Sequence, residues 1–428
     1  MTSLSENVLM FRDMTPAGDH LFRPAQAHSI EETGLSPNLV FDLVLKHAYF
    51  EGTATLSKLA QRSKLSSAII HSIYRQLQKE HLCETRAMIR DDYEIFLSAR
   101  GRDMVEVALR KSHYAGPAPV PLADYNHSVS AQAMPVQVTA ESLKSNLSDL
   151  VLPADVIKEL GAALVTGGAI VLYGSTGNGK TSIAERLHRV WNSLIYVPYA
   201  VEVSGQIVTV YDPLIHRAEP QDAASEHSRW VLCSRPMVKV GGELRSDMLD
   251  PRVDEITRIG IAPLQMKANN GILLIDDFGR QQITPRELLN RWIVPLDRCT
   301  DVLSLWSGVS FEIPFQVLVV FATNLPLSDL AEDAFMRRLK NKIKIEPLED
   351  DLFRELLRRV SAEKGIPCSP EMENLIVDEC RRRSPDGLRA CFPVDLMGII
   401  AGMAKFEQRN PVLKRAEAER ALKLYFVH

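Results

Sequence analysis

One short run rich in glycine limits what this chain can fold into more than any other part of it. Residues 174–181 read GSTGNGKT, which satisfies the pattern G-x-x-x-x-G-K-[ST] in full. The apolar residues 169–173 before it predict a buried strand, and residues 182–191 after it predict a helix. A strand, a glycine turn and a helix in this order gather backbone N–H groups and the positive end of a helix dipole around a phosphate. The alternative, a glycine turn with a solvated lysine, does not require this strand and helix.

The residue types of the loop predict how a nucleotide would be held. Lys180 would place its charge on the β- and γ-phosphates, and the Thr181 hydroxyl would bind Mg²⁺. The expected cofactors are therefore ATP and Mg²⁺. The predicted phosphate-binding set is Gly174, Ser175, Thr176, Gly177, Asn178, Gly179, Lys180, Thr181 and Ser182.

A second pattern is a buried strand that ends in two acids. Residues 271–275 read GILLI and are followed by Asp276 and Asp277. This is the Walker B pattern, in which Asp276 holds Mg²⁺ through water. Asp277 is then the candidate for polarising the water that attacks the nucleotide. The alternative is that Asp277 only caps the turn at residues 278–279.

Together with a third pattern, these motifs resemble the AAA+ superfamily over about residues 138–428. The apolar strand at residues 317–322 precedes Asn324 and looks like the sensor-1 strand of that family. The resemblance implies that Asn324 orients the attacking water. A lone asparagine after a strand is otherwise a turn former.

A pair of arginines extends this resemblance. Arg337 and Arg338 precede the predicted strand at residues 342–345, where AAA+ proteins place an arginine finger directed at the neighbouring subunit's nucleotide. The family pattern favours Arg338, with Arg337 second. The alternative is two cations at the C-terminal end of a helix, where the dipole favours them.

Two positions depart from the family pattern. Asp277 stands where the family usually has glutamate, and its side chain is one methylene shorter. The sensor-2 arginine usually begins the third helix of the lid, whereas here Arg389 lies before Pro393. Contact of Arg389 with the γ-phosphate and an ordinary surface position are equally compatible with the sequence.

The order of apolar patterns predicts an α/β fold. It consists of a P-loop NTPase base of the AAA+ type with a parallel sheet and a C-terminal helical lid, preceded by a winged helix-turn-helix domain. Residues 302–306 and 309–313 resemble the pre-sensor-1 hairpin of the MoxR-like, Clp-like and RuvB-like branches. The expected buried parallel strands are 169–173, 194–197, 272–275 and 317–322. The expected domains are an N-terminal extension (1–35), a winged-helix-like domain (36–114), a Pro-, Ala- and Ser-rich linker (115–137), the nucleotide-binding base (138–346) and the helical lid (347–428).

The winged-helix-like domain leaves DNA binding open. Residues 36–114 hold 12 Lys or Arg against 9 Asp or Glu, a weak basic excess for a DNA reader. Arg75 and Lys79 lie on the expected recognition helix, and Arg86 and Arg90 lie on the expected wing. Winged helices also dock proteins, so the fold does not decide between the two partners.

The remaining features favour a cytoplasmic protein that contacts no membrane. No apolar run approaches about 18 residues, and no two of the six cysteines form a C-x-x-C pair, which disfavours a zinc ribbon. The whole layout looks like bacterial proteins described as predicted ATPases with chaperone activity. It implies an ATP-hydrolysing homo-oligomer, a hexameric ring that remodels an unknown protein client. A DNA-binding regulator and a nucleotide-binding scaffold with negligible turnover are the alternatives.

Overall fold

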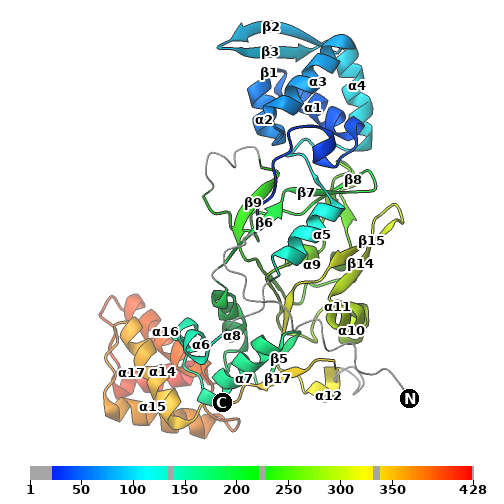
Figure 1. Ribbon diagram of the computed structural model, residues 1–428. Coiled ribbons are helices and arrows are strands. Elements are labelled where there is room, and N and C mark those ends of the chain that lie inside the picture. Colours follow the sequence, from blue (N-terminus) through cyan, green and yellow to red (C-terminus); the bar gives the residue numbers. More distant parts are fainter. Residues whose placement is uncertain (1–21, 134–137, 192, 221–227, 331–337, 427–428) are drawn as a thin grey trace, which may run out of the picture.

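The computed structural model describes residues 22–133, 138–191, 193–220, 228–330 and 338–426 (Figure 1). The N-terminal helices lie at one end of the molecule and the C-terminal helices at the other, with the sheets between them. None of the helices in these ranges is long and apolar enough to cross a membrane.

A five-stranded parallel sheet forms the centre of an α/β fold, as the sequence predicts. Its order is β10 (Met237–Val240), β13 (Ile272–Ile275), β16 (Leu318–Thr323), β5 (Ile170–Tyr173) and β17 (Asn341–Lys344). In the three central strands β13, β16 and β5, alternate residues enter two different cores: Val171 and Leu273 enter one, and Leu172 and Leu274 enter the other. Strands buried on both faces in this way explain the continuous apolar runs in the sequence.

One predicted strand lies elsewhere. Residues 194–197 were expected in the parallel sheet, but β6 (Leu194–Pro198) pairs antiparallel with β9 (Trp230–Ser234) in a separate two-stranded sheet. Ile195 and Val197 are buried while Leu194 and Tyr196 are only partly so. This alternation suits a strand with one buried face, and β10 takes the place at the edge of the parallel sheet.

A second sheet lies between the parallel sheet and the N-terminal helices (Figure 1). Its order is β11 (Arg252–Val253), β12 (Gly260–Ile261), β8 (Gln206–Thr209), β7 (Ala200–Val203) and β4 (Val120–Pro121). Strands β14 (Thr300–Ser304) and β15 (Ser310–Pro314) form an antiparallel hairpin whose buried residues join the same core. The hairpin expected at residues 302–313 is therefore present.

Residues 115–133 of the predicted linker (115–137) are folded into the protein and do not form a linker. It contains β4 and helix α5 (Leu122–Ala131). Tyr125 and Val129 are buried in the core of the second sheet, and the Tyr125 hydroxyl donates to Met266 O at 3.1 Å. The Pro- and Ala-rich composition concealed this short amphipathic helix. Residues 134–137 lie outside the described residues.

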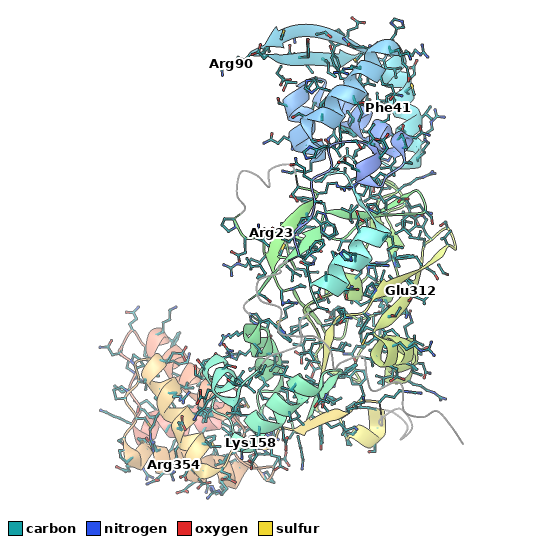
Figure 2. All side chains as sticks on the ribbon, viewed as in Figure 1. Arg23, Phe41, Arg90, Lys158, Glu312 and Arg354 are labelled. Carbon is teal, nitrogen blue, oxygen red and sulfur yellow. The ribbon has the colours of Figure 1, made fainter. Side chains whose placement is uncertain are left out.

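The N-terminal domain combines four helices with three short strands. It comprises α1 (Pro37–Glu51), β1 (Thr53–Thr55), α2 (Leu56–Ser63), α3 (Ser67–Lys79), β2 (Cys83–Ile89), β3 (Asp92–Leu97) and α4 (Ala99–Lys111). Its strands form one antiparallel sheet in the order β1-β3-β2. Arg90 lies at the far tip of the β2–β3 hairpin (Figure 2).

The described part of the predicted N-terminal extension packs against the rest of the chain. The buried guanidinium of Arg229 donates to Thr33 O and Pro119 O at 3.0 and 2.9 Å. Phe22 stacks edge-on against Trp230, with ring centroids 5.7 Å apart. These contacts hold residues 22–35 against the start of β9, whereas residues 1–21 lie outside the described residues.

Four helices follow β17 within the region expected to form a helical lid, residues 347–428. They are α14 (Asp350–Glu363), α15 (Pro370–Arg383), α16 (Cys391–Phe406) and α17 (Arg415–Tyr425), and they share one core. The helices around the parallel sheet and the hairpin are α6 (Ala140–Asn146), α7 (Ala154–Thr166), α8 (Lys180–Leu187), α9 (Leu264–Lys267), α10 (Pro285–Arg291), α11 (Ile293–Arg298) and α12 (Leu327–Leu330).

Candidate functional site

The glycine loop connects β5 to α8 and is enclosed by two other segments. Gly174 has φ +135°, and a Cβ there would collide with the Ile345 carbonyl that follows β17. Gly177 has φ +82°, and a Cβ there would lie 2.6 Å from Cys391 Sγ at the start of α16. Backbone conformation and space both require glycine at these two positions. The loop is therefore held between the sheet and the C-terminal helices.

Lys180 lies inside the loop rather than in solvent. Its Nζ donates to Gly174 O at 2.9 Å and to Ser175 O at 2.8 Å. Burial lowers the pKa of Lys180, and the charges of Asp277 and Asp276 oppose that shift. The ammonium is therefore placed where it faces the loop on one side and the two acids on the other.

Thr181 and Asp276 meet across the carboxyl edge of the sheet. Thr181 Oγ1 donates to Asp276 Oδ1 at 2.8 Å. A hydroxyl and a carboxylate are the hard oxygen ligands that Mg²⁺ takes beside nucleotide phosphates. No cluster of three or more His, Cys, Asp or Glu able to hold a metal occurs in the described residues. The donor set thus fits Mg²⁺ held jointly with phosphates better than a closed metal cage.

Asp277 does not cap the turn that follows it. Gly279 N donates to the Gln281 side chain at 2.8 Å, and Gln281 Nε2 donates to Asp276 O at 2.9 Å, so Gln281 holds this turn. The exposed Asp277 carboxylate accepts no hydrogen bond from any residue within the described ranges. Asp277 has φ +49°. Its carboxylate is therefore available to a water, and the capping alternative loses its basis.

Asn324 follows β16, which lies between β5 and β13. Its Oδ1 is buried and has no hydrogen-bond partner among the described residues. Thr323 links this strand end to the turn after Asp276, because its hydroxyl donates to Phe278 O at 2.7 Å. An unpartnered amide oxygen at this edge is costly unless a ligand or water satisfies it. The structure thus brings Asn324 to the same edge as Lys180 and Asp276.

Arg389 lies against the glycine loop. Cys391 N donates to Gly177 O at 2.9 Å, and Arg389 Cδ would be 3.6 Å from a Cβ on Gly177. Arg389 Nη2 donates to Asp386 at 2.6 Å, whereas its Nε is buried without a partner in the described chain. Arg389 therefore lies beside the loop with one guanidinium nitrogen unpaired, and both possibilities for it stay open.

The arginine pair is only partly described. Arg338 Nε donates to Asp297 Oδ2 at 3.1 Å, and both side chains are about half-exposed. Asp297 belongs to α11, 41 positions earlier in the sequence. Arg337 lies outside the described residues. Within this chain, the structure therefore places Arg338 on an acid at the surface rather than at the glycine loop.

Lys239 is a candidate site residue that sequence reasoning missed. Its Nζ lies 2.8 Å from Glu185 Oε1 and 3.2 Å from Asp276 Oδ2. Hydrogen bonding to Glu185, and then to Asp276, raises the pKa of Lys239. Because β10 had not been predicted as a strand of this sheet, no pattern pointed to Lys239. Its register opposite Leu274 places it close to the strand end that carries the acid.

His216 and Cys233 do not form a metal site. His216 Nδ1 accepts from Asp212 N and its Nε2 bonds Lys267 O, both at 2.9 Å, so its two nitrogens are used within the fold. Cys233 is a buried thiol in β9. His216 lies in the loop between β8 and β9, and Cys233 lies in β9 of the two-stranded sheet, so both residues have contacts within the fold.

The chain is similar to one family model over a short segment and to solved structures at low sequence identity. A family model described as "Domain of unknown function (DUF8689)" matches residues 349–424, which hold α14 to α17. No curated protein matches the chain at a significant level. A mutant of RuvB from Thermotoga maritima is 13% identical, with 67% of this chain and 70% of that one covered and a TM-score of 0.35. NtrX from Brucella abortus is 12% identical, with coverage of 75% and 62% and a TM-score of 0.37. Both TM-scores are below 0.5, so these similarities do not support the fold assignment. The assignment is based on the strand order of this chain's parallel sheet.

The position of Lys239 leads to a prediction about Mg²⁺. Lys239→Met removes a cation that competes for the Asp276 carboxylate, so the Mg²⁺ concentration that supports half of maximal binding of a fluorescent ATP analogue should fall. The pair is partly exposed, so the expected change is roughly two- to fivefold. Lys158→Met, on an exposed lysine paired with Asp155 on α7, is the control. An unchanged or higher Mg²⁺ requirement in Lys239→Met would show that the pair does not compete with the metal.

Proposed function

We propose that this chain is an ATP-binding and ATP-hydrolysing AAA+ protein of the pre-sensor-1 hairpin branch that works as a ring and remodels a protein or complex. The observation that carries the proposal is the bond between Thr181 and Asp276 at the carboxyl edge of a parallel sheet. Its support is the strand order, because β16 lies between β5 and β13 and brings Asn324 to the same edge. The hairpin of β14 and β15 supports the choice of branch.

The side chains at this edge divide the work of hydrolysis. The loop amides and Lys180 bind the phosphates, and Thr181 and Asp276 would hold Mg²⁺. Bound Mg²⁺ would neutralise charge on the phosphate oxygens. Asp277 polarises the attacking water, and the Asn324 amide orients it beside the γ-phosphate. Arg389, next to Gly177, adds a guanidinium from the lid.

The proposed ring has six subunits, with each nucleotide completed by an arginine of the neighbour. Arg338 is the first candidate and Arg337 the second. The exposed ion pair with Asp297 is worth little in water, so Arg338 can exchange Asp297 for a phosphate when subunits meet. Asp297 is then the partner of Arg338 when no neighbouring nucleotide is in contact with the arginine.

A DNA-bound regulator is the second candidate function. On the exposed face of α3, Arg75 and Lys79 have no ion-pair partner within the described chain, and Arg90 extends the same domain at the tip of the wing (Figure 2). Arg86, by contrast, lies 3.8 Å from Glu94 and is partly neutralised. A salt-dependent shift of linear duplex DNA by the full chain that Arg75→Ala weakens would favour this alternative. Substrate-stimulated ATP turnover without DNA would favour remodelling.

The first prediction concerns nucleotide binding. Lys180→Ala should abolish measurable ATP affinity, because it removes the buried cation of the loop. The fold should persist, since the Lys180 ammonium bonds only two loop carbonyls. Calorimetric titration with Mg-ATP and far-UV circular dichroism measure the two effects. Undiminished ATP affinity in a folded Lys180→Ala protein would refute the assignment of the loop.

The second prediction separates hydrolysis from binding. Asp277→Asn should bind ATP almost normally and hydrolyse it at least about 100-fold more slowly, because the amide cannot polarise the water. Phosphate release and nucleotide affinity, measured on the same preparation, test this. Wild-type turnover in Asp277→Asn would place the base elsewhere. Negligible turnover in the wild-type chain with intact ATP binding would instead support the scaffold alternative.

The third prediction concerns catalysis between subunits. Arg338→Ala should bind ATP and lose about 10³-fold in turnover, the range of a finger supplied in trans. Asp297→Asn is the matched control, because it breaks the same ion pair but keeps the arginine. Mixing Arg338→Ala with Lys180→Ala should restore part of the activity, since some interfaces then hold an intact loop and an intact arginine. Full activity of Arg338→Ala alone would move the role to Arg337.

A further inference from the structure

A cavity of about 600 Å³ lies between the N-terminal domain and the second sheet, and no residue of the candidate active site lines it. Its volume lies within the usual range for small-molecule sites. Three parts of the chain supply its walls: helices α1 and α4, the β7–β8 turn with residues 253–258, and the tip of the β14–β15 hairpin. A ligand there would touch all three parts at once.

The walls of the cavity are held by direct contacts. His113 N, just after α4, donates to Thr257 O at 2.8 Å. Gln206 Nε2 donates to Ser307 Oγ at 2.6 Å and joins the second sheet to the hairpin tip. The Trp306 ring lies so close to β12 that a Cβ on Gly260 would be 2.6 Å from it. These contacts fix the segments that form the walls of the cavity relative to one another.

Lys46 is the unusual residue of this cavity. Its side chain lines the cavity, yet the residue is only 5% exposed. Its ammonium forms no hydrogen bond or ion pair within the described chain. The nearby acid Asp42 is already paired with Lys111, with Lys111 Nζ 3.1 Å from Asp42 Oδ2. Lys46 Nζ itself is not among the buried polar atoms that lack a partner, so it reaches the space of the cavity. An anionic group bound in the cavity would therefore meet a cation that no acid of the described chain pairs with.

The other walls indicate what kind of molecule would fit. Leu43 and Ile207 are buried residues that line the cavity, and Trp306 adds an aromatic ring. Arg258, also in the lining, carries a further positive charge and donates to Arg110 O at 2.8 Å. The charged residues of the lining are Lys46, Lys111 and Arg258 against Asp42 and Glu255, so the cavity combines an apolar surface with a net positive charge of one.

We propose that this cavity binds a small organic anion. Its carboxylate or phosphate head would meet the Lys46 ammonium, and its apolar body would lie against Leu43, Ile207 and Trp306. Because the walls belong to three parts of the chain, the bound anion would fasten the N-terminal domain to the second sheet and the hairpin. This site is independent of the nucleotide chemistry proposed above.

A titration of the full chain with 8-anilinonaphthalene-1-sulfonate, an aromatic anion, tests the proposal. The wild-type chain should show saturable fluorescence enhancement. Lys46→Met should raise the dissociation constant of the probe about tenfold or more, because a charged hydrogen bond is lost. The exposed Lys158→Met is the matched control and should bind like the wild type. Benzoate and phenyl phosphate should displace the probe and distinguish the two head groups, whereas neutral benzyl alcohol should not.

The melting temperature of Lys46→Met separates this site from a structural role. Methionine replaces an unpaired cation with an apolar chain of similar length at a residue that is only 5% exposed, so the variant should melt at or above the wild-type temperature. A clear decrease would show that Lys46 has a partner within the chain and would overturn the proposal. It would also be overturned if the wild type showed no saturable binding, if Lys46→Met bound the probe as tightly, or if benzyl alcohol displaced it equally well.

Discussion

The position of β16 between β5 and β13 is the constraint on which the site depends. In this register Tyr173 lies opposite Thr323, and Ile275 lies opposite Phe321, so the three strands end at one edge. The glycine loop, Asn324 and Asp276 each follow one of these ends. Burial of the strands on both faces fixes the register, because a shift by one residue would exchange the two cores. Packing of the sheet thus determines the geometry of the polar groups.

The glycine loop is also the place where the C-terminal helices meet the sheet. Gly177 touches Cys391 at the start of α16, and Leu348 pairs with Leu388 just before it. These contacts place Arg389 beside the loop without any bond from its guanidinium to it. A change in loop conformation would therefore displace the start of α16 first. This is a physical basis for linking the proposed nucleotide site to movement of the lid helices.

Features that depend on neighbouring residues could be predicted from the sequence. The glycine loop, the strand before Asp276 and the four C-terminal helices are each encoded by a local pattern of apolar and special residues. Features that depend on distant partners could not. β10 is a four-residue edge strand with a lysine inside it, and Asp297 meets Arg338 only through the fold. In the sequence, Lys46 is an ordinary polar position of a helix. Only the fold brings residues of the second sheet and the hairpin tip close to it.

Composition also misled where burial decides the structure. Residues 115–137 contain enough proline and alanine to indicate a linker, yet Tyr125 anchors α5 by packing and by its bond to Met266. The same reasoning applies to Leu194–Pro198, whose apolar content predicted a central strand although only alternate side chains are buried over most of its length. In both segments the spacing of buried side chains carried more information than the number of apolar residues.

Two cations at the proposed nucleotide site, and Arg338 at the surface, already have an acid partner. Lys239 contacts Glu185 and Asp276, Arg389 contacts Asp386, and Arg338 contacts Asp297. In each pair at least one side chain is more than 40% exposed, and partly exposed pairs contribute little free energy in water. A polyphosphate can therefore recruit the cations by exchanging partners at low cost. Lys180 differs from the other three cations because it is buried and its ammonium bonds only loop carbonyls. Among these four cations, it is therefore the one already placed in the loop before any ligand binds.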